Sequence, residues 1–382
     1  MRIKNPFKFD IEVAGDFFCG RKQEIADLVE HIENETNIIM FAKRRIGKSS
    51  LLKEVFTHHL PKNILKTHID IYSVSNIREL YLKIVKGIEE SLLGFESNLK
   101  KLSRLVDKLQ NYFANAKVSL VLSGKPQLKI EATEKDYFQA IESLFSHYFE
   151  FLADHNLQAV IAIDEFQKIV SLNESEKIEE LLRTIANKRV NTSFVYTGSK
   201  RNILLAMFND SGRAFFKLGT EFELPPISKN EFYLWVNERM ALKNLRVEIS
   251  AFEHLYHEAD GETRFIQQVC HEIFRLHQNK DIIDLNRIQE IICDVIRKKT
   301  YNAQLLNRYT AAQQNTLKLI ASSNGVNIYQ NDLLSTFGVS KATAQSSLRS
   351  LLKEGVIFQD LNGALSFEDV EFKLWLRFIS ES

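Results

Sequence analysis

Short apolar runs alternate with longer stretches of helical period from the N-terminus to about residue 230. This alternation is typical of βαβ units, which build a parallel sheet, so we expect an α/β fold. The runs are too short and too apolar to be surface helices. The predicted strands are Asn37–Phe41, Thr67–Tyr72, Gln158–Ile163, Ser193–Thr197 and Phe222–Leu224.

One interruption of this alternation lies between the second and third strands. Apolar residues from Leu99 to Phe113 recur at mostly three- and four-residue intervals, which indicates an amphipathic helix. Two β-rich runs in Val118–Ile130 flank a Ser-Gly-Lys-Pro turn signal and predict a hairpin. We therefore expect an insertion at residues 95–135 in a core of residues 1–227. Because an apolar helical stripe usually packs on its own protein, core-covering structure is favoured over a partner-binding surface.

Two further units are predicted after this core. Pro225-Pro226 end the last strand, and the sequence from Ser228 to about residue 300 is helical throughout. We expect residues 228–304 to form a separate helical lid subdomain. Residues 305–382 form the third unit, with helices from Thr310, from Asn331 and over Lys341–Glu354, then a hairpin over Val356–Phe367 that turns at Asn362-Gly363. Three helices and a hairpin in that order predict a winged helix-turn-helix domain.

Charge and cysteine content narrow the classes of protein. The net charge is +1, so the chain as a whole has no field that would attract nucleic acid or membrane. Its three cysteines are far apart and lack CxxC spacing, which argues against disulfides and zinc and favours buried free thiols in a reducing compartment. No apolar run approaches the length of a membrane span. We expect a soluble, cytoplasmic protein with no membrane partner.

The first strand leads through a loop into a helix that begins near Lys48. Such a loop aims backbone N–H groups and the positive end of the helix dipole at one point, which suits a polyphosphate. Gly47 lets the backbone approach, Lys48 can reach the β- and γ-phosphates, and the Ser49 hydroxyl can ligate Mg²⁺. Ala42 stands where the GxxxxGK[ST] motif has its first glycine. The predicted nucleotide-binding residues here are Ala42, Arg44, Arg45, Ile46, Gly47, Lys48, Ser49 and Ser50.

A second motif, a pair of acidic residues, follows more than a hundred residues after the loop. The apolar run QAVIAI ends in Asp164-Glu165, at the carboxyl end of a predicted buried strand, where ligands bind in open α/β sheets. Asp164 would hold the Mg²⁺ and Glu165 would orient or deprotonate the attacking water. The alternative is a strand that simply ends in acidic residues at the surface.

The next strand ends in Thr197-Gly198-Ser199 at the same expected edge of the sheet. Ser199 is the candidate sensor of the γ-phosphate, although a serine there can equally cap the following helix. Arg213 lies in a loop-like stretch before the fifth strand and is a candidate arginine finger for a neighbouring subunit's nucleotide. Its alternative is an ordinary solvated charge.

These motifs together resemble the archaeal-type ATPase family, within the AAA+-like STAND group of P-loop NTPases. The resemblance rests on Arg44–Ser49, Phe18–Arg21 with Glu24, Thr197–Ser199, Ala259–Gln267 and Phe367–Asp369 with Phe372 and Trp375. It implies a five-stranded P-loop sheet of order 5-1-4-3-2, a helical lid and a C-terminal winged helix.

The resemblance also implies roles for two arginines: Arg21 would lie near the adenine, and Arg264 would act as a lid sensor close to the phosphates. The chain departs from the family pattern at Ala42, at Thr263 and at Val370, where glycine, proline and proline respectively are common. Some members carry a nuclease-like domain after the winged helix, but none is predicted within these 382 residues.

The predicted third helix of the winged unit offers donors for phosphates and base edges at Lys341, Thr343, Gln345, Ser346, Arg349 and Lys353. A DNA-binding domain normally has a net basic face, whereas acidic and basic residues balance from Leu306 onward. Duplex DNA and a protein contact therefore remain as alternative partners of this unit.

The sequence predicts an ATPase that uses ATP and Mg²⁺ to drive a conformational switch, with a homo-oligomer or a protein partner as candidate assemblies. Two alternatives remain at this stage. One is an ATP-regulated DNA-binding protein that uses the winged helix. The other is a non-catalytic scaffold that binds nucleotide only as a structural element.

Overall fold

The computed structural model describes residues 3–95, 118–123, 125–130, 137–277, 281–359 and 363–381. The chain divides into two compact units. We call the first the sheet unit, which comprises Arg21–Ala42 and Lys48–Leu224. The second, the helical unit, comprises Met1–Gly20, Lys43–Gly47 and Pro225–Ser382. Because residues 1–20 and 43–47 group with the helical unit, the two units interleave along the chain.

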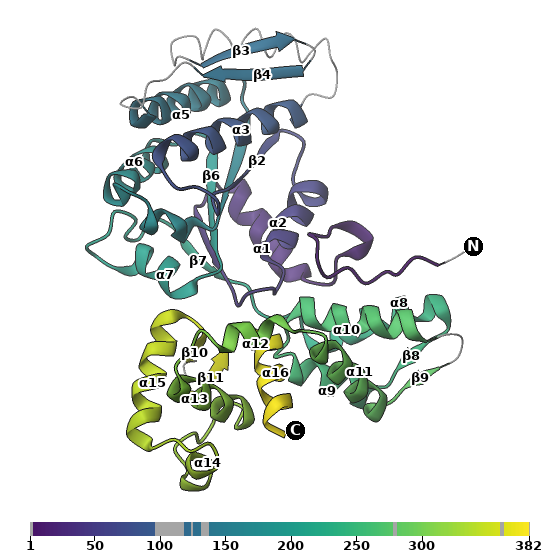
Figure 1. Ribbon diagram of the computed structural model, residues 1–382. Coiled ribbons are helices and arrows are strands. Elements are labelled where there is room, and N and C mark those ends of the chain that lie inside the picture. The colour runs from purple at the N-terminus through teal and green to yellow at the C-terminus, as the bar shows by residue number, and fades with distance from the viewer. Residues whose placement is uncertain are drawn as a thin grey trace. The chain divides into compact units, whose positions relative to one another are not determined.

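The sheet unit is built on a parallel five-stranded sheet (Figure 1). Its strands in spatial order are β2 (Ile64–Asp70), β5 (Gln158–Asp164), β6 (Thr192–Gly198), β1 (Ile38–Phe41) and β7 (Thr220–Glu223). Counted along the chain, these five strands have the order 5-1-4-3-2, so the predicted P-loop NTPase sheet is confirmed. The observed strand bounds lie within three residues of the predicted ones.

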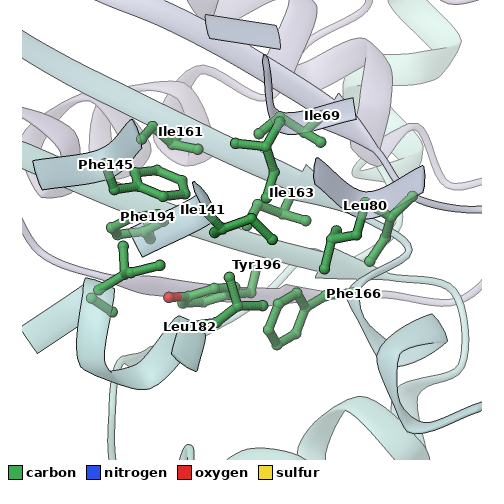
Figure 2. Packing of buried hydrophobic residues seen from close by; sticks show 14 of the residues in the cluster. Ile69, Leu80, Ile141, Phe145, Ile161, Ile163, Phe166, Leu182, Phe194 and Tyr196 are labelled. Carbon is green, nitrogen blue, oxygen red and sulfur yellow. The ribbon is translucent and has the colours of Figure 1, made fainter. Parts of the chain in front are cut away.

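Helices cover this sheet, and every residue of β1 and β6 is buried. Burial of consecutive residues is expected where both faces of a parallel sheet are covered. Figure 2 shows part of the core, in which Phe166 lies against Tyr196 with ring centroids 4.5 Å apart. The helical segments of the sheet unit are α1 (Lys22–Glu33), α2 (Lys48–Glu54), a π-helical turn (Val55–His59), α3 (Ile77–Phe95), α5 (Tyr137–Asp154), a 3₁₀ segment η5 (Phe166–Ser171), α6 (Ser175–Lys188) and α7 (Arg201–Asn209).

The predicted hairpin of the insertion is present as β3 (Val118–Ser123) and β4 (Lys125–Ile130). The two strands are antiparallel, with Val118 opposite Ile130. The amphipathic helix expected over 99–113 lies outside the described residues.

The helical unit contains α8 (Lys229–Met240), α9 (Ile249–Glu258), α10 (Thr263–Leu276) and α11 (Leu285–Arg297). Two short parallel strands, β8 (Arg246–Val247) and β9 (Ile282–Ile283), correct the expectation that this region is helical throughout. Each has two residues, too few for an alternating pattern to be recognised. Single 3₁₀ turns lie at Gly15–Phe17 and Ala241–Lys243.

The N-terminal segment packs into this core through Phe7, whose ring contacts those of Trp235 and Phe274 at centroid distances of 5.7 and 6.1 Å. The first residues therefore belong with α8 and α10 rather than with the sheet. The proposed division into three domains stays a prediction.

The C-terminal part has the predicted order of three helices followed by a hairpin. A capping box between Thr310 and Gln313 begins the first helix. These elements are α13 (Ala311–Ser322), α14 (Asn331–Thr336), α15 (Lys341–Glu354), β10 (Ile357–Gln359) and β11 (Leu365–Phe367), with α12 (Tyr301–Leu306) before them and α16 (Val370–Glu381) after them. The order of elements that a winged helix requires is thus present. Asn362 of the expected turn lies outside the described residues, and the winged-helix domain itself stays a prediction.

The three cysteines, all within the described residues, form no disulfide. Cys19 and Cys270 are buried as expected, but Cys293 is exposed, so the expectation of three buried thiols is wrong. On α11 the apolar face consists of neighbours such as Ile292 and Ile296, and helical period turns Cys293 away from it. Among the helices that the structure describes, none combines the length and the apolar character needed to cross a membrane.

Candidate functional site

Three chain segments bring polar side chains to one edge of the sheet. β5 ends at Asp164, β6 ends at Gly198, and α2 begins at Lys48 shortly after β1. Because β1, β6 and β5 are adjacent and parallel, their carboxyl ends meet at the same edge. The sheet topology therefore gathers the predicted Lys48, Ser49, Asp164 and Ser199.

Asp164 is the centre of this cluster. Its Oδ2 accepts a hydrogen bond from the Ser49 hydroxyl at 3.2 Å. Its Oδ1 accepts from the Thr197 hydroxyl and, at 2.9 Å, from the backbone N–H of Glu165. The carboxylate is thus oriented from three sides, by α2, by β6 and by its own chain.

Glu165 follows in the left-handed region, with φ 57°. This conformation is uncommon for a residue with a side chain and is found where the surroundings hold it, often at functional sites. Its Oε2 accepts from the Gln167 amide Nε2 at 2.5 Å and from the Ser199 hydroxyl at 2.9 Å. The two predicted catalytic residues, Glu165 and Ser199, are therefore in direct contact.

Two members of this cluster were not assigned a role from the sequence. Thr197 is predicted only as part of a strand end, and Gln167 carries no prediction. The available signal for Gln167 was a polar residue two positions after Glu165, in an otherwise mostly apolar run. The Thr197–Asp164 contact could not be read from spacing, because it joins two strands that the fold brings together. The Gln167–Glu165 contact is local, but whether two side chains two positions apart meet depends on the backbone conformation, which the sequence does not show.

The oxygen atoms near Ser49 suit a hard divalent cation. A hydroxyl and a carboxylate oxygen 3.2 Å apart could share one metal ion, and Mg²⁺ is usually held by one or two such protein oxygens together with substrate phosphates and water. In the described part of the chain no group of three or more His, Cys, Asp and Glu side chains could form a metal cage. The residues fit Mg²⁺ brought with a phosphate ligand, and its assignment to Ser49 and Asp164 stays a prediction.

The loop before α2 contains two residues with positive φ, Arg45 at 61° and Gly47 at 105°. A side chain on Gly47 would meet no atom within 4 Å, so conformation rather than space calls for glycine there. Ala42 is not among the residues with positive φ, and its side chain is buried. Alanine therefore fits the position of the first motif glycine without backbone strain.

Residues 43–47 form a dense set of contacts within the helical unit. The backbone N–H of Arg264 donates to the Arg45 carbonyl at 3.3 Å, and the Thr263 hydroxyl donates to the Ile46 carbonyl at 3.1 Å. The Arg45 guanidinium lies 3.0 Å from the Asp369 carboxylate. The first turn of α10 and the residue before α16 thus hold this loop segment through both backbone and side chains.

Arg264, the expected lid sensor, is itself paired. Its guanidinium donates to Glu371 at 3.0 Å and to Asp10 at 2.8 Å. Glu371 also accepts from Lys299 at 3.0 Å and from the Tyr301 hydroxyl at 2.8 Å. Contact of Arg264 with a phosphate would require it to leave at least one of these carboxylates, and the sensor role stays a prediction.

Glu262, which precedes Thr263, is a buried carboxyl group. Its side chain is fully buried, and in the described structure neither carboxyl oxygen has a hydrogen-bond partner. Burial raises the pKa of Glu262 to about 7, although the charge of Arg45 opposes this rise. The group therefore loses its proton near neutral pH, well above the ordinary range of a glutamate.

We expect Glu262→Gln to stabilise the protein at pH 8 and to have little effect near pH 5. Because the folded pKa lies above the ordinary value of 4.5, Glu262 favours the fold below that value and loses this contribution as the pH rises through about 7. The loss reaches about 3 kcal/mol at most, at roughly 1.4 kcal/mol per pKa unit. Thermal unfolding from pH 5 to pH 8 measures it, with the exposed Glu238→Gln as control. An effect of Glu262→Gln that does not change with pH would contradict this prediction.

The two remaining predicted residues, Arg21 and Arg213, are both ion-paired within the sheet unit. Arg21 is buried at the N-terminus of α1 and donates to Glu24 at 3.2 Å. Arg213 makes two hydrogen bonds to the carboxylate of Glu179, which is almost fully buried. This pairing fastens the segment after α7 to α6, and a role of Arg213 in another subunit's site stays a prediction.

Similarity to solved structures extends over nearly the whole chain. A Walker-type ATPase of Pyrococcus abyssi matches with a TM-score of 0.65 and 18% identity, covering 97% of this chain and 99% of that chain. The ORC2 protein of Aeropyrum pernix, in its ADPNP–ADP complexes, matches with a TM-score of 0.56 and 14% identity, covering 98% and 97%. At these identities the likeness concerns the fold. No curated protein matches the chain in sequence.

The sequence of the sheet unit supplies the stronger evidence of relationship. A family model described as the ATPase domain predominantly from Archaea matches residues 18–220. This span is more than half of the chain and contains the loop before α2, Asp164-Glu165 and Thr197–Ser199. With the parallel sheet of order 5-1-4-3-2 and the cluster at its carboxyl edge, the match shows that the chain belongs to this family of ATPase domains found predominantly in Archaea.

Proposed function

We propose that this chain binds ATP with Mg²⁺ and hydrolyses it to ADP and phosphate, and that turnover drives a conformational switch. The observation that carries the proposal is the cluster of Ser49, Asp164 and Glu165 beside the N-terminus of α2. A helix N-terminus favours phosphate, and a paired aspartate and glutamate supply a metal ligand and a base.

In this proposal the side chains have distinct tasks. Lys48 and the backbone N–H groups of the loop hold the β- and γ-phosphates, while Ser49 and Asp164 hold the metal ion. When bound, Mg²⁺ neutralises charge on the phosphate oxygens. The oxygen of a water molecule bonds to the γ-phosphorus as the bond to the β–γ bridging oxygen breaks, and the electron pair leaves on ADP. Glu165 orients that water and takes up its proton.

The link to a conformational switch rests on the contacts of residues 43–47. Their carbonyls accept hydrogen bonds from Thr263 and Arg264, and the Arg45 side chain pairs with Asp369. A phosphate that reorders the loop backbone would therefore act on α10 and on the start of α16. An energetic link of this kind is what a nucleotide-driven switch requires.

A second candidate function, ATP-regulated binding of duplex DNA, is favoured by the surface of α15. Lys341, Gln345, Arg349 and Lys353 are exposed and recur at four-residue spacing, so they form one stripe along this helix. Lys and Arg contact phosphates and Gln can read adenine, as a recognition helix requires. Because acidic and basic residues balance in the C-terminal part, we expect only weak binding to DNA phosphates that does not depend on base sequence.

One experiment addresses both functions. We expect the purified chain to release phosphate from ATP in Mg²⁺ and to lose this activity in excess EDTA, with recovery on adding Mg²⁺ again. Rates are measured with and without duplex DNA at low and moderate salt. Stimulation or nucleotide-dependent DNA binding that weakens with salt supports the second function. No phosphate release under any of these conditions would contradict the first.

A further inference from the structure

Gln167 is a buried amide whose surroundings do not satisfy it. It lies in η5 with 6% of its surface exposed, and its Oε1 has no hydrogen-bond partner in the described structure. An apolar side chain of similar length would avoid this unfavourable burial of an acceptor. The Nε2, in contrast, donates to Glu165 Oε2 at 2.5 Å. The one hydrogen bond recorded for this side chain is thus the one to the proposed base.

Gly198 provides the space that this amide occupies. A Cβ at Gly198 would lie 2.0 Å from Gln167 Oε1, closer than real Cβ atoms come, and 3.0 Å from its Cδ, which is a tight contact. Gly198 does not have positive φ, so its backbone does not require glycine. The need for glycine at the end of β6 therefore comes from the side chain of Gln167 passing beside it.

The hydrogen bonds fix how the Glu165 carboxylate is presented. Gln167 and Ser199 approach from different segments, η5 and the residue after β6, and both donate to Oε2. Two donors on one oxygen hold the carboxylate plane and leave Oε1 as the oxygen available to accept from a water. Orientation of this kind matters because a base acts only within hydrogen-bond reach of the proton it removes.

We propose that Gln167 is the positioning residue for Glu165, and that Gly198 is required because it makes room for the Gln167 amide. The inference rests on the proposed hydrolysis, and it adds a residue that contacts neither nucleotide nor metal in that scheme. Gln167 takes no part in proton transfer. The proton of the attacking water goes to Glu165, and the Gln167 amide stays unchanged as a hydrogen-bond donor.

The first test is Gln167→Met, which keeps the length and volume of the side chain but removes the donor. We expect kcat to fall roughly 10- to 100-fold, while KM and the dissociation constant for ATP stay within about threefold of the parent. The melting temperature should not fall, because the unpaired Oε1 is removed as well. Gln139→Met, on the exposed face of α5, is the matched control and should leave kcat unchanged.

The second test uses the steric relation between the two residues. Gly198→Ala should lower kcat about as much as Gln167→Met, since the new methyl group displaces the amide. In a Gln167→Ala background the same substitution should change kcat less than about threefold, because the remaining neighbour, Leu204 Cδ2, would lie 3.4 Å away. Such non-additivity is expected only if Gly198 acts through Gln167.

The outcomes separate this inference from the function on which it rests. If the parent hydrolyses ATP, Glu165→Gln does not, and Gln167→Met keeps the parental kcat, the positioning role is overturned while the function stands. Equal effects of Gly198→Ala in both backgrounds would overturn the steric part. If the parent protein does not hydrolyse ATP, both the proposed function and the positioning role of Gln167 are overturned.

Discussion

Glu165→Gln should abolish ATP turnover while leaving nucleotide binding intact. Glutamine keeps the shape of the side chain and can still accept from Ser199, but it cannot take up the proton of the attacking water. Loss of a general base costs typically 10²- to 10⁴-fold in rate. Phosphate release under saturating ATP and Mg²⁺ measures this loss, and calorimetry with ATP measures the retained binding.

The control for this substitution is Glu176→Gln, an equal change of charge at an exposed position on α6. It should leave both turnover and binding at parental values. Equal turnover in Glu165→Gln and the parent would remove Glu165 from the mechanism. If the parent also binds ATP without hydrolysing it, the chain is instead a non-catalytic scaffold.

The sheet and the convergence at its edge could be predicted because both depend on local pattern. Apolar runs such as Gln158–Ile163 are recognised from length and composition alone, and the observed strand extends this one only to Asp164. The order of the strands came from the family resemblance, not from the pattern. Once that order is known, β5, β6 and β1 lie side by side, so the end of β5 and the start of the helix after β1 come to the same edge of the sheet, where Ser49 and Asp164 lie within hydrogen-bond distance.

The partners of each charged side chain could not be predicted in the same way. Arg213 and Glu179 are 34 positions apart, and Arg264 and Glu371 are 107 apart. Nothing in the spacing links them, because each pair depends on packing between segments that sequence order does not relate. Arg213 is a candidate finger from its loop position and Arg264 a candidate sensor from the family resemblance, whereas the structure shows which carboxylate each would have to release to contact a nucleotide.

The burial of polar groups that lack a hydrogen-bond partner could not be predicted from the sequence either. Glu262 and Gln167 look like ordinary polar residues in a sequence, and surface positions are their usual place. Their burial becomes visible only in the structure, where Glu262 is enclosed beside the Arg45 loop and Gln167 beside Gly198. Each keeps an unfavourable group inside the fold, and such groups in native structures need an explanation.

Lys48→Ala should weaken ATP binding by roughly 10- to 100-fold, as expected when charge-assisted hydrogen bonds worth about 1.5–3 kcal/mol are removed. Lys48 is the first residue of α2 and is buried, with a relative exposure of 8%. An ammonium group held there is close to the N–H groups of the helix start, which repel it and attract phosphate. The loss should appear in the dissociation constant for both ATP and ADP, because both carry a β-phosphate.

The matched control is Lys53→Ala, which removes the same charge from an exposed position of the same helix. If helix stability or net charge governed affinity, the two substitutions would have similar effects. If affinity instead depends on the location of Lys48 at the phosphate site, Lys53→Ala should leave the dissociation constant for ATP within about twofold of the parent. An unchanged constant for Lys48→Ala in calorimetry would show that phosphate binds elsewhere, and the roles of Ser49, Asp164 and Glu165 would then lose their common ligand.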